Sequence, residues 1–71
     1  MEWNHIEGNW DKLKGKFKEK WGKLTDDDLT AVGGKKDQLV GSLKKNYGMQ
    51  KEEAERQLEE FSTKLEKDSI Q

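Results

Sequence analysis

The sequence contains no cysteine and no proline, and only 30% of its 71 residues are hydrophobic. Without cysteine, neither a disulfide nor a thiolate metal site can stabilise the fold. No apolar run approaches the ~18 residues of a membrane span, and the first residues lack the apolar core of a signal peptide. We therefore expect a cytoplasmic protein that folds by helix packing alone, with a stability of about 3–5 kcal/mol.

Charged residues make up 41% of the chain, a proportion typical of disordered proteins. Disorder is not expected, however, because three tryptophans, two phenylalanines and one tyrosine recur at regular spacings. The net charge of −1 is divided unevenly, with −2 on residues 1–10, +4 on residues 11–48 and −3 on residues 49–71. This asymmetry is mild and does not by itself indicate a nucleic-acid partner.

Apolar residues at intervals of three or four predict two helices in the N-terminal half. The first covers residues 4–21, and Gly22 is expected to end it in the left-handed conformation. The second covers residues 26–32, because Thr25 and Asp28 have the spacing of a capping box. The buried stripe of the first helix is expected to consist of Trp3, Ile6, Trp10, Leu13, Phe17, Trp21 and Leu24.

The C-terminal half predicts two further helices, over residues 35–47 and 51–67. Gly48 lies between them as the expected stop of the third helix. Residues 68–71 are expected to fray. The buried residues of these helices are expected to be Leu39, Val40, Leu43, Tyr47, Ala54, Leu58, Phe61 and Leu65.

The two halves of the chain are similar in sequence. When Gly8 is aligned with Gly34, both halves read Gly-x-x-Asp-x-Leu-x-Gly, followed by an apolar residue, a lysine, an aromatic residue and a glycine. Each half is therefore a long helix, a glycine stop and a second helix with acidic residues in its first turn. One such hairpin cannot bury its apolar stripe alone. We expect residues 1–71 to form a single all-α domain, a small four-helix bundle built from two similar helical hairpins.

Glycines inside the predicted helices are unusual, since each costs about 1 kcal/mol relative to alanine. Gly15 and Gly41 lie roughly 150–160° from the centre of their own apolar stripes, and Gly8 and Gly34 share that face. The glycines could form a contact surface for a partner, allow a local bend, keep the helices marginally stable, or be tolerated at the surface. The candidate interaction surface consists of Gly8, Gly15, Gly34, Gly41, Lys12 and Lys16.

Residues with the chemistry of an active site are scarce. His5 is the only histidine, and no serine has a histidine at helical spacing. A calcium loop that began at Asp26 would have Ala31 at the position that requires glycine, so we interpret the acidic cluster as a helix cap. We predict no enzyme, no cofactor, no metal site and no small-molecule substrate.

Two kinds of binding were weighed for the basic part of the chain. Residues 9–24 combine six lysines and two acids with an apolar stripe, which is the profile of a membrane-surface helix. The stripe is better explained as core, and the spacing of the lysines scatters them around the helix. Paired helical hairpins also occur in DNA-binding modules, but the corresponding turns here are acidic. A membrane or nucleic-acid partner is possible but not favoured, and we expect a monomer.

The segments "GNWDKLKGKFKEKWGKLTDDDL" (Gly8 to Leu29) and "GKKDQLVGSLKKNYGMQKEEAE" (Gly34 to Glu55) resemble the CsbD family of small bacterial proteins. The resemblance covers roughly residues 6–61 and departs from the family pattern at Gln50 and at the doubled glycine before Lys35. It implies a general stress-response protein whose two hairpins pack roughly orthogonally, and it supplies no catalytic residues. The expected function is that of a hydrophilic protectant; the alternative is a helical interaction module that binds a protein or a nucleic acid.

Overall fold

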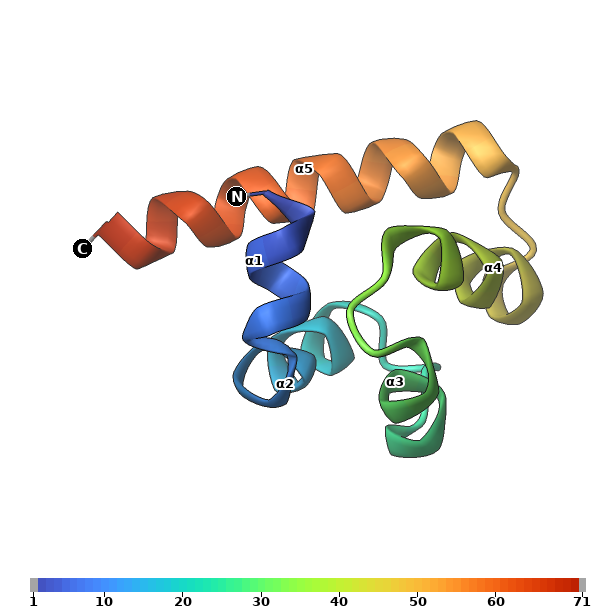
Figure 1. The fold of residues 1–71 in the computed structure, drawn as a ribbon. Coiled ribbons are helices and arrows are strands. Elements are labelled where there is room, and N and C mark those ends of the chain that lie inside the picture. The colour runs from blue at the N-terminus through green and yellow to red at the C-terminus, as the bar shows by residue number, and fades with distance from the viewer. Residues whose placement is uncertain (1, 71) are drawn as a thin grey trace.

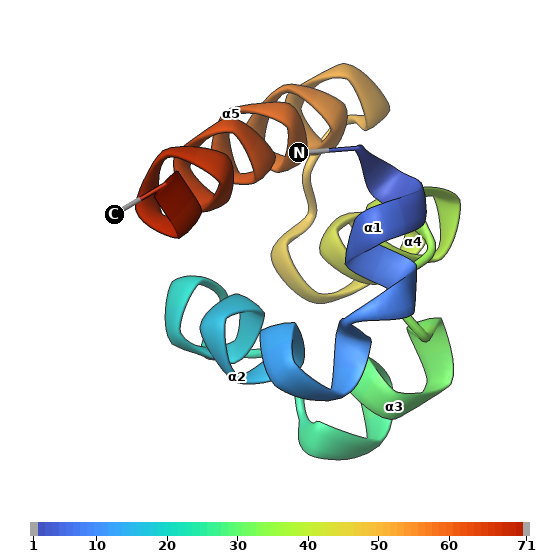
Figure 2. The ribbon, with the colours of Figure 1, turned by 60° about the vertical axis from the view of Figure 1, so that its left-hand side comes forward.

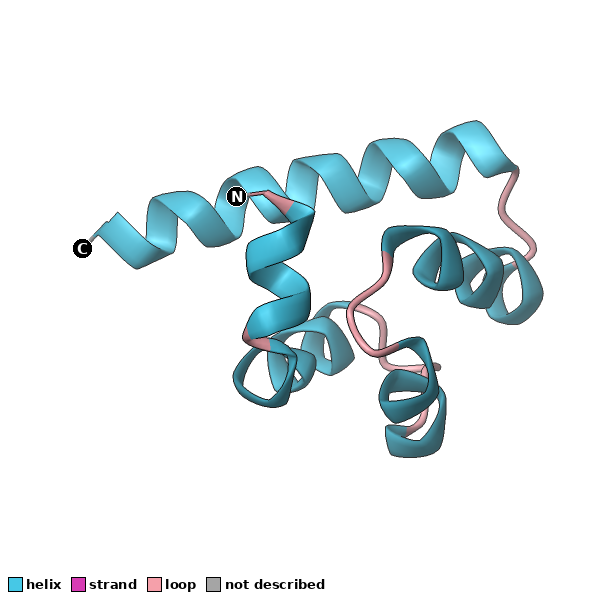
Figure 3. Cartoon of the chain, viewed as in Figure 1, coloured by secondary structure: helices cyan, strands magenta, loops and turns pink. Residues whose placement is uncertain are grey.

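The computed structural model describes the backbone of residues 2–70 and the side chains of residues 2–67. Within this part of the chain the fold is all-helical, as predicted, and contains no strand (Figure 3). The helices are α1 (Trp3–Gly8), α2 (Trp10–Lys20), α3 (Asp26–Val32), α4 (Lys36–Tyr47) and α5 (Lys51–Ile70). In Figures 1 and 2, α5 lies along one side of the molecule, and α3 lies on the side farthest from it. The described residues thus form five helices where four were predicted, and the specific bundle of two similar hairpins is not confirmed.

The additional helix arises because the predicted helix over residues 4–21 is broken at Asn9. Asn9 has φ −115° and ψ 22°, outside the helical range, and it follows Gly8, a poor helix former. The Asn9 side-chain amide donates to the carbonyl oxygen of His5 at 2.9 Å, which satisfies a carbonyl at the end of α1. The chain changes direction here, so that α1 runs from the level of α5 down to α2 (Figure 1).

The predicted capping box at the start of α3 is confirmed. The Thr25 hydroxyl accepts a hydrogen bond from the Asp28 backbone N–H at 3.1 Å, and an Asp28 carboxylate oxygen accepts one from the Thr25 N–H at 3.3 Å. Two donors at the helix start are therefore satisfied reciprocally, even though aspartate is shorter than the usual glutamate.

The two predicted glycine stops differ. Gly48 ends α4 with φ 69°, as expected for a left-handed cap. Gly22 is not left-handed, and the prediction for it is wrong: α2 already ends at Trp21, which has φ −121° and ψ 80°. The Trp21 indole N–H donates to the side-chain oxygen of Gln57 at 3.1 Å. Because this buried side chain is held by α5, the chain leaves the helix at the tryptophan itself.

Helix α5 continues beyond the predicted end at Lys67. Its backbone is helical to Ile70, while the side chains of residues 68–70 and the whole of Gln71 lie outside the described residues. The fraying of residues 68–71 stays a prediction.

The core is made by most of the predicted apolar stripes together with two residues of α3, while Trp3, Leu13 and Tyr47 are only partly buried. Phe17 lies at its centre, with ring-centroid distances of 4.9 Å to Trp10, 5.8 Å to Trp21 and 4.9 Å to Phe61. The Cα radius of gyration of 11.2 Å is close to the ~11 Å expected for a folded chain of this length. The aromatic residues therefore offset the polar composition, and the chain is compact. The buried hydrophobic residues are Ile6, Trp10, Phe17, Trp21, Leu24, Leu29, Val32, Leu39, Val40, Leu43, Ala54, Leu58, Phe61 and Leu65.

Candidate functional site

The described residues contain no cluster with the composition of a metal site. Within that part of the chain, no three or more His, Asp or Glu side chains converge so that they could hold an ion. None of the described helices combines the length and the apolarity needed to cross a bilayer. The remaining candidates are surfaces, and they fall at the glycines, at a groove beside Trp3 and along the lysines of α2.

The four glycines of the candidate interaction surface differ in burial. Gly8, Gly15 and Gly41 are exposed, and a Cβ atom added at any of them would have no contact within 4 Å. Gly34 is buried, so it does not share their exposed face. A Cβ atom on Gly34 would lie 2.9 Å from the Glu7 Cα, because the loop before α4 passes directly against α1. The pattern of spacing could not separate this structural glycine from the exposed ones.

A groove between α1, α4 and α5 contains one of the exposed glycines. Trp3, Val40 and Gly41 supply the uncharged part of its lining. Its charged lining mixes both signs and consists of Glu7, Lys35, Lys36, Asp37, Lys44, Lys51 and Glu55. The candidate surface predicted from sequence included Gly41 but missed Trp3, which was assigned to the core and is only partly buried. The position of Trp3 at the end of the apolar stripe was the sequence signal that could have indicated its partial exposure.

An ion pair joins α4 and α5 near the groove and also involves Trp3. The Lys36 ammonium pairs with the Glu59 carboxylate and lies 6.0 Å from the centre of the Trp3 ring. The hydrogen bond from Lys36, and to a smaller extent its charge, lowers the pKa of Glu59 below the ordinary value for a glutamate. The Trp3 indole N–H is buried and has no partner of normal hydrogen-bond geometry among the described residues, although the indole also helps to lower that pKa. Three helices thus meet at one partly exposed contact.

The lysines of α2 form two rows on either side of its buried stripe, so they do not gather on one face of the helix. One row, Lys14 and Lys18, faces α3, where the Lys18 ammonium lies 2.9 Å from a carboxylate oxygen of Asp26. The hydrogen bond and charge of Lys18, with a smaller effect of Lys14, lower the pKa of Asp26. The other row contains Lys16 and Lys20 and faces α5. Among the described residues, the first row has a carboxylate within ion-pair distance, and the second row has none.

Comparison with known proteins connects most of the chain to one family. Residues 4–56 match the family model described as CsbD-like. The chain is 54% identical to UPF0337 protein YjbJ of Escherichia coli strain K12 over 59 residues, which cover 83% of this chain and 86% of that protein. It is 52% identical to UPF0337 protein ECA0631 of Pectobacterium atrosepticum over 61 residues, 86% of this chain and 88% of that protein. No solved structure matches this chain.

Proposed function

We propose that this chain, which belongs to the CsbD-like family, is a non-enzymatic stress-response protein that acts in the cytoplasm as a hydrophilic protectant. The family is conventionally associated with stress responses, and the printed names of the relatives state no activity. A protectant needs no catalytic group. It needs a surface that remains hydrated and a core that does not attach to other proteins.

One observation carries the proposal: every charged side chain among residues 2–67 reaches solvent. None of these charged side chains is buried. Ser62 is the only buried polar residue in that part of the chain. The tryptophan, phenylalanine and leucine side chains of the core are sealed beneath this charged shell. Exposed apolar patches are what lead proteins to associate, so a surface of this kind resists aggregation at high concentration.

The mechanism follows from hydration rather than from a binding pocket. Lysine, aspartate and glutamate side chains hold water strongly, and a compact domain that carries many of them separates other macromolecules without adhering to them. We expect a monomer. We also expect protection to increase with concentration and not to saturate at a fixed ratio of protectant to client.

A freeze–thaw assay with a cold-sensitive enzyme tests this mechanism. The recovered enzyme activity is measured with the full chain, with an inert protein of equal mass, and with a variant carrying Glu2→Gln, Lys45→Gln, Glu52→Gln and Lys67→Gln. The variant keeps the net charge of −1 because it removes two positive and two negative exposed side chains. We expect the full chain to exceed the inert protein and the variant to lie between them. Equal recovery with the full chain and the inert protein would refute the protectant function.

The alternative, an interaction module for a protein or nucleic-acid partner, is favoured by the groove that Trp3, Val40 and Gly41 line between α1, α4 and α5. A partly exposed tryptophan beside lysines is a typical contact residue of interfaces. Amide chemical shifts measured in a stressed-cell extract discriminate the two functions. An interaction module gives saturable shifts confined to the groove, whereas a protectant gives none.

A further inference from the structure

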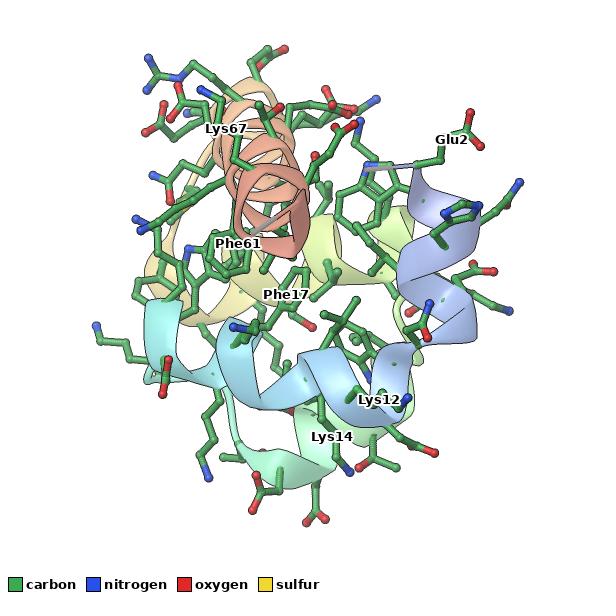
Figure 4. The ribbon with its side chains drawn as sticks, turned by 90° about the vertical axis from the view of Figure 1, so that its left-hand side faces the viewer. Glu2, Lys12, Lys14, Phe17, Phe61 and Lys67 are labelled. Atoms are coloured by element: carbon green, nitrogen blue, oxygen red, sulfur yellow. The ribbon has the colours of Figure 1, made fainter. Side chains whose placement is uncertain are left out.

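A shallow cleft runs between α2 and α5, and lysines from both helices border it. Lys16 and Lys20 border it from α2, Lys64 borders it from α5, and Phe61 and Leu65 contribute its apolar lining. A second hollow that shares Lys20, Phe61 and Lys64 extends it toward the N-terminal part of α5. Figure 4 shows Phe61 between the two helices, directed toward Phe17 beneath it.

The cleft has an excess of positive charge, although the whole chain has a net charge of −1. Its three lysines form no ion pair with any residue that the structure describes. Two carboxylates, of Glu19 and Glu60, also border it. The lining of the two hollows therefore carries three lysines and two glutamates, an excess of one positive charge. The excess is therefore local to this cleft, whereas Asp26 neutralises much of the opposite flank of α2.

We propose that this cleft binds single-stranded nucleic acid through the phosphodiester backbone. Lysines four residues apart on a helix are separated by a rise of about 6 Å, comparable to the distance between neighbouring phosphates on an extended strand. Lys16 and Lys20 can therefore contact successive phosphates, while Lys64 contacts the strand from the opposite side. A duplex or a flat bilayer presents its phosphates on a broad, stiff surface, so we expect it to reach the lysines at the edge of the cleft without entering it.

The affinity expected from these contacts is modest and independent of base sequence. Phosphate contacts carry no direct sequence information, and no aromatic face in the cleft is exposed enough to stack on a base, since Phe61 is 9% exposed. Three lysine–phosphate contacts with a single strand predict a slope of log K against log salt of about −2.1. Binding should therefore weaken about 20-fold between ~50 and ~200 mM salt.

Fluorescence anisotropy with a labelled single-stranded RNA of about a dozen mixed-sequence nucleotides tests the proposal on the full chain. We expect saturable binding at low salt with the slope given above. Lys16→Gln combined with Lys20→Gln should lower the magnitude of the slope by about 1.4 and weaken low-salt binding by at least about tenfold. Lys64→Gln alone should lower the magnitude of the slope by about 0.7, and this result would show that α5 also contacts the strand.

The control variant removes the same charge elsewhere. Lys14→Gln combined with Lys45→Gln replaces one lysine on the α3 side of α2 and one exposed lysine of α4. Its affinity should stay within about threefold of the unsubstituted chain, because distant surface charges are largely screened. Far-UV circular dichroism on each variant verifies that the helices remain, as expected for substitutions outside the buried core.

Several outcomes overturn the proposal. One is the absence of RNA binding at low salt, and another is an equal loss of affinity in the two double variants. A duplex that binds as tightly as the single strand would show that the cleft does not select a strand. If vesicles of anionic phospholipid bind the chain through Lys16 and Lys20 while RNA does not, the cleft is a membrane contact instead.

Discussion

Replacing Gly34 by alanine is expected to destabilise this protein by about 3 kcal/mol, although it adds a single methyl group. Gly34 has φ +83°, and its added Cβ atom would lie 2.9 Å from the Glu7 Cα and 3.1 Å from the Trp10 Cε3. The first of these neighbours is a backbone atom of α1. It cannot move aside by a rotamer change, so α1 or the loop before α4 must shift.

Three effects determine the magnitude. A left-handed conformation costs a non-glycine residue about 1–2 kcal/mol, and forcing a methyl group into a packed site costs about 1–3 kcal/mol. Alanine also reduces the entropy of the unfolded chain, which offsets about 0.4–1 kcal/mol. The net loss is comparable to the ~3–5 kcal/mol stability expected for a domain of this size. Gly34→Ala should therefore populate the unfolded state detectably in buffer without denaturant.

Gly15→Ala is the matched control, because it adds the same methyl group to an exposed helical glycine with no atom within 4 Å of the new Cβ. It should stabilise the protein by about 0.5–1 kcal/mol, and Gly41→Ala should behave alike. Urea unfolding followed by tryptophan fluorescence and circular dichroism measures all three, and Gly34→Ala can be repeated in the stabilised background if it is largely unfolded. A Gly34→Ala protein within ~0.5 kcal/mol of the unsubstituted chain would refute the reasoning. A loss of stability in Gly15→Ala would show that something packs on that face.

Three further predictions concern single contacts. Thr25→Ala removes the cap of α3 and should cost about 1 kcal/mol in urea unfolding, whereas Thr25→Ser should cost much less. Trp10→Phe removes the indole hydrogen bond to the Leu29 carbonyl oxygen, which is 2.7 Å long, and should cost about 1–2 kcal/mol while the helical circular dichroism spectrum is retained. Lys36 holds the pKa of Glu59 below its ordinary value, so this carboxylate stabilises the fold above its unfolded pKa of about 4.3 and loses that effect as the pH falls through the folded value. The difference in melting temperature between the unsubstituted chain and Glu59→Gln should therefore be present at neutral pH and disappear in acid; a difference that persists in acid would contradict this.

Local signals in the sequence were sufficient for most of the helices. The capping residues before α3 and the glycine after α4 act within one turn of the chain, so the bounds of α3 and the end of α4 could be predicted from neighbours alone. The apolar stripes identified the core for the same reason, because helical periodicity directly specifies one face.

The break at Asn9 could not be predicted in this way. The stripe from Trp3 to Leu24 has an unbroken helical period, and Asn9 continues the backbone hydrogen bonding to His5. Gly8 weakens the helix before Asn9, but a glycine alone does not specify a change of direction. The direction is decided by packing, since Trp10 donates its indole hydrogen to α3 while Trp3 lies beside the α4–α5 contact. Periodicity records which residues are buried, but it does not record what each of them is buried against.

The internal repeat also led to a wrong expectation, namely that aligned glycines share one face. Gly8 and Gly34 occupy equivalent places in the two halves, yet one is exposed and the other is buried. The close contact of Gly34 is with Glu7, the residue before Gly8. The glycine of the second half therefore packs against the first half, whereas the equivalent glycine of the first half is exposed. Similar sequences in the two halves do not produce similar contacts. Aligned positions in this chain have to be tested separately, which is why the alanine substitutions above are expected to differ in sign.

The exposed glycines bear on how this fold is tuned. Gly15 and Gly41 lie inside α2 and α4, and neither glycine interrupts its helix. Within 4 Å of their added Cβ atoms no other part of the chain is present, so internal packing does not account for them. Relative to alanine, the two glycines together lower the free energy of unfolding by about 2 kcal/mol, a large fraction of the ~3–5 kcal/mol expected for the whole domain. Among the explanations open from sequence, only a contact with a partner predicts that Gly41→Ala weakens binding at the groove beside Trp3 while it raises stability.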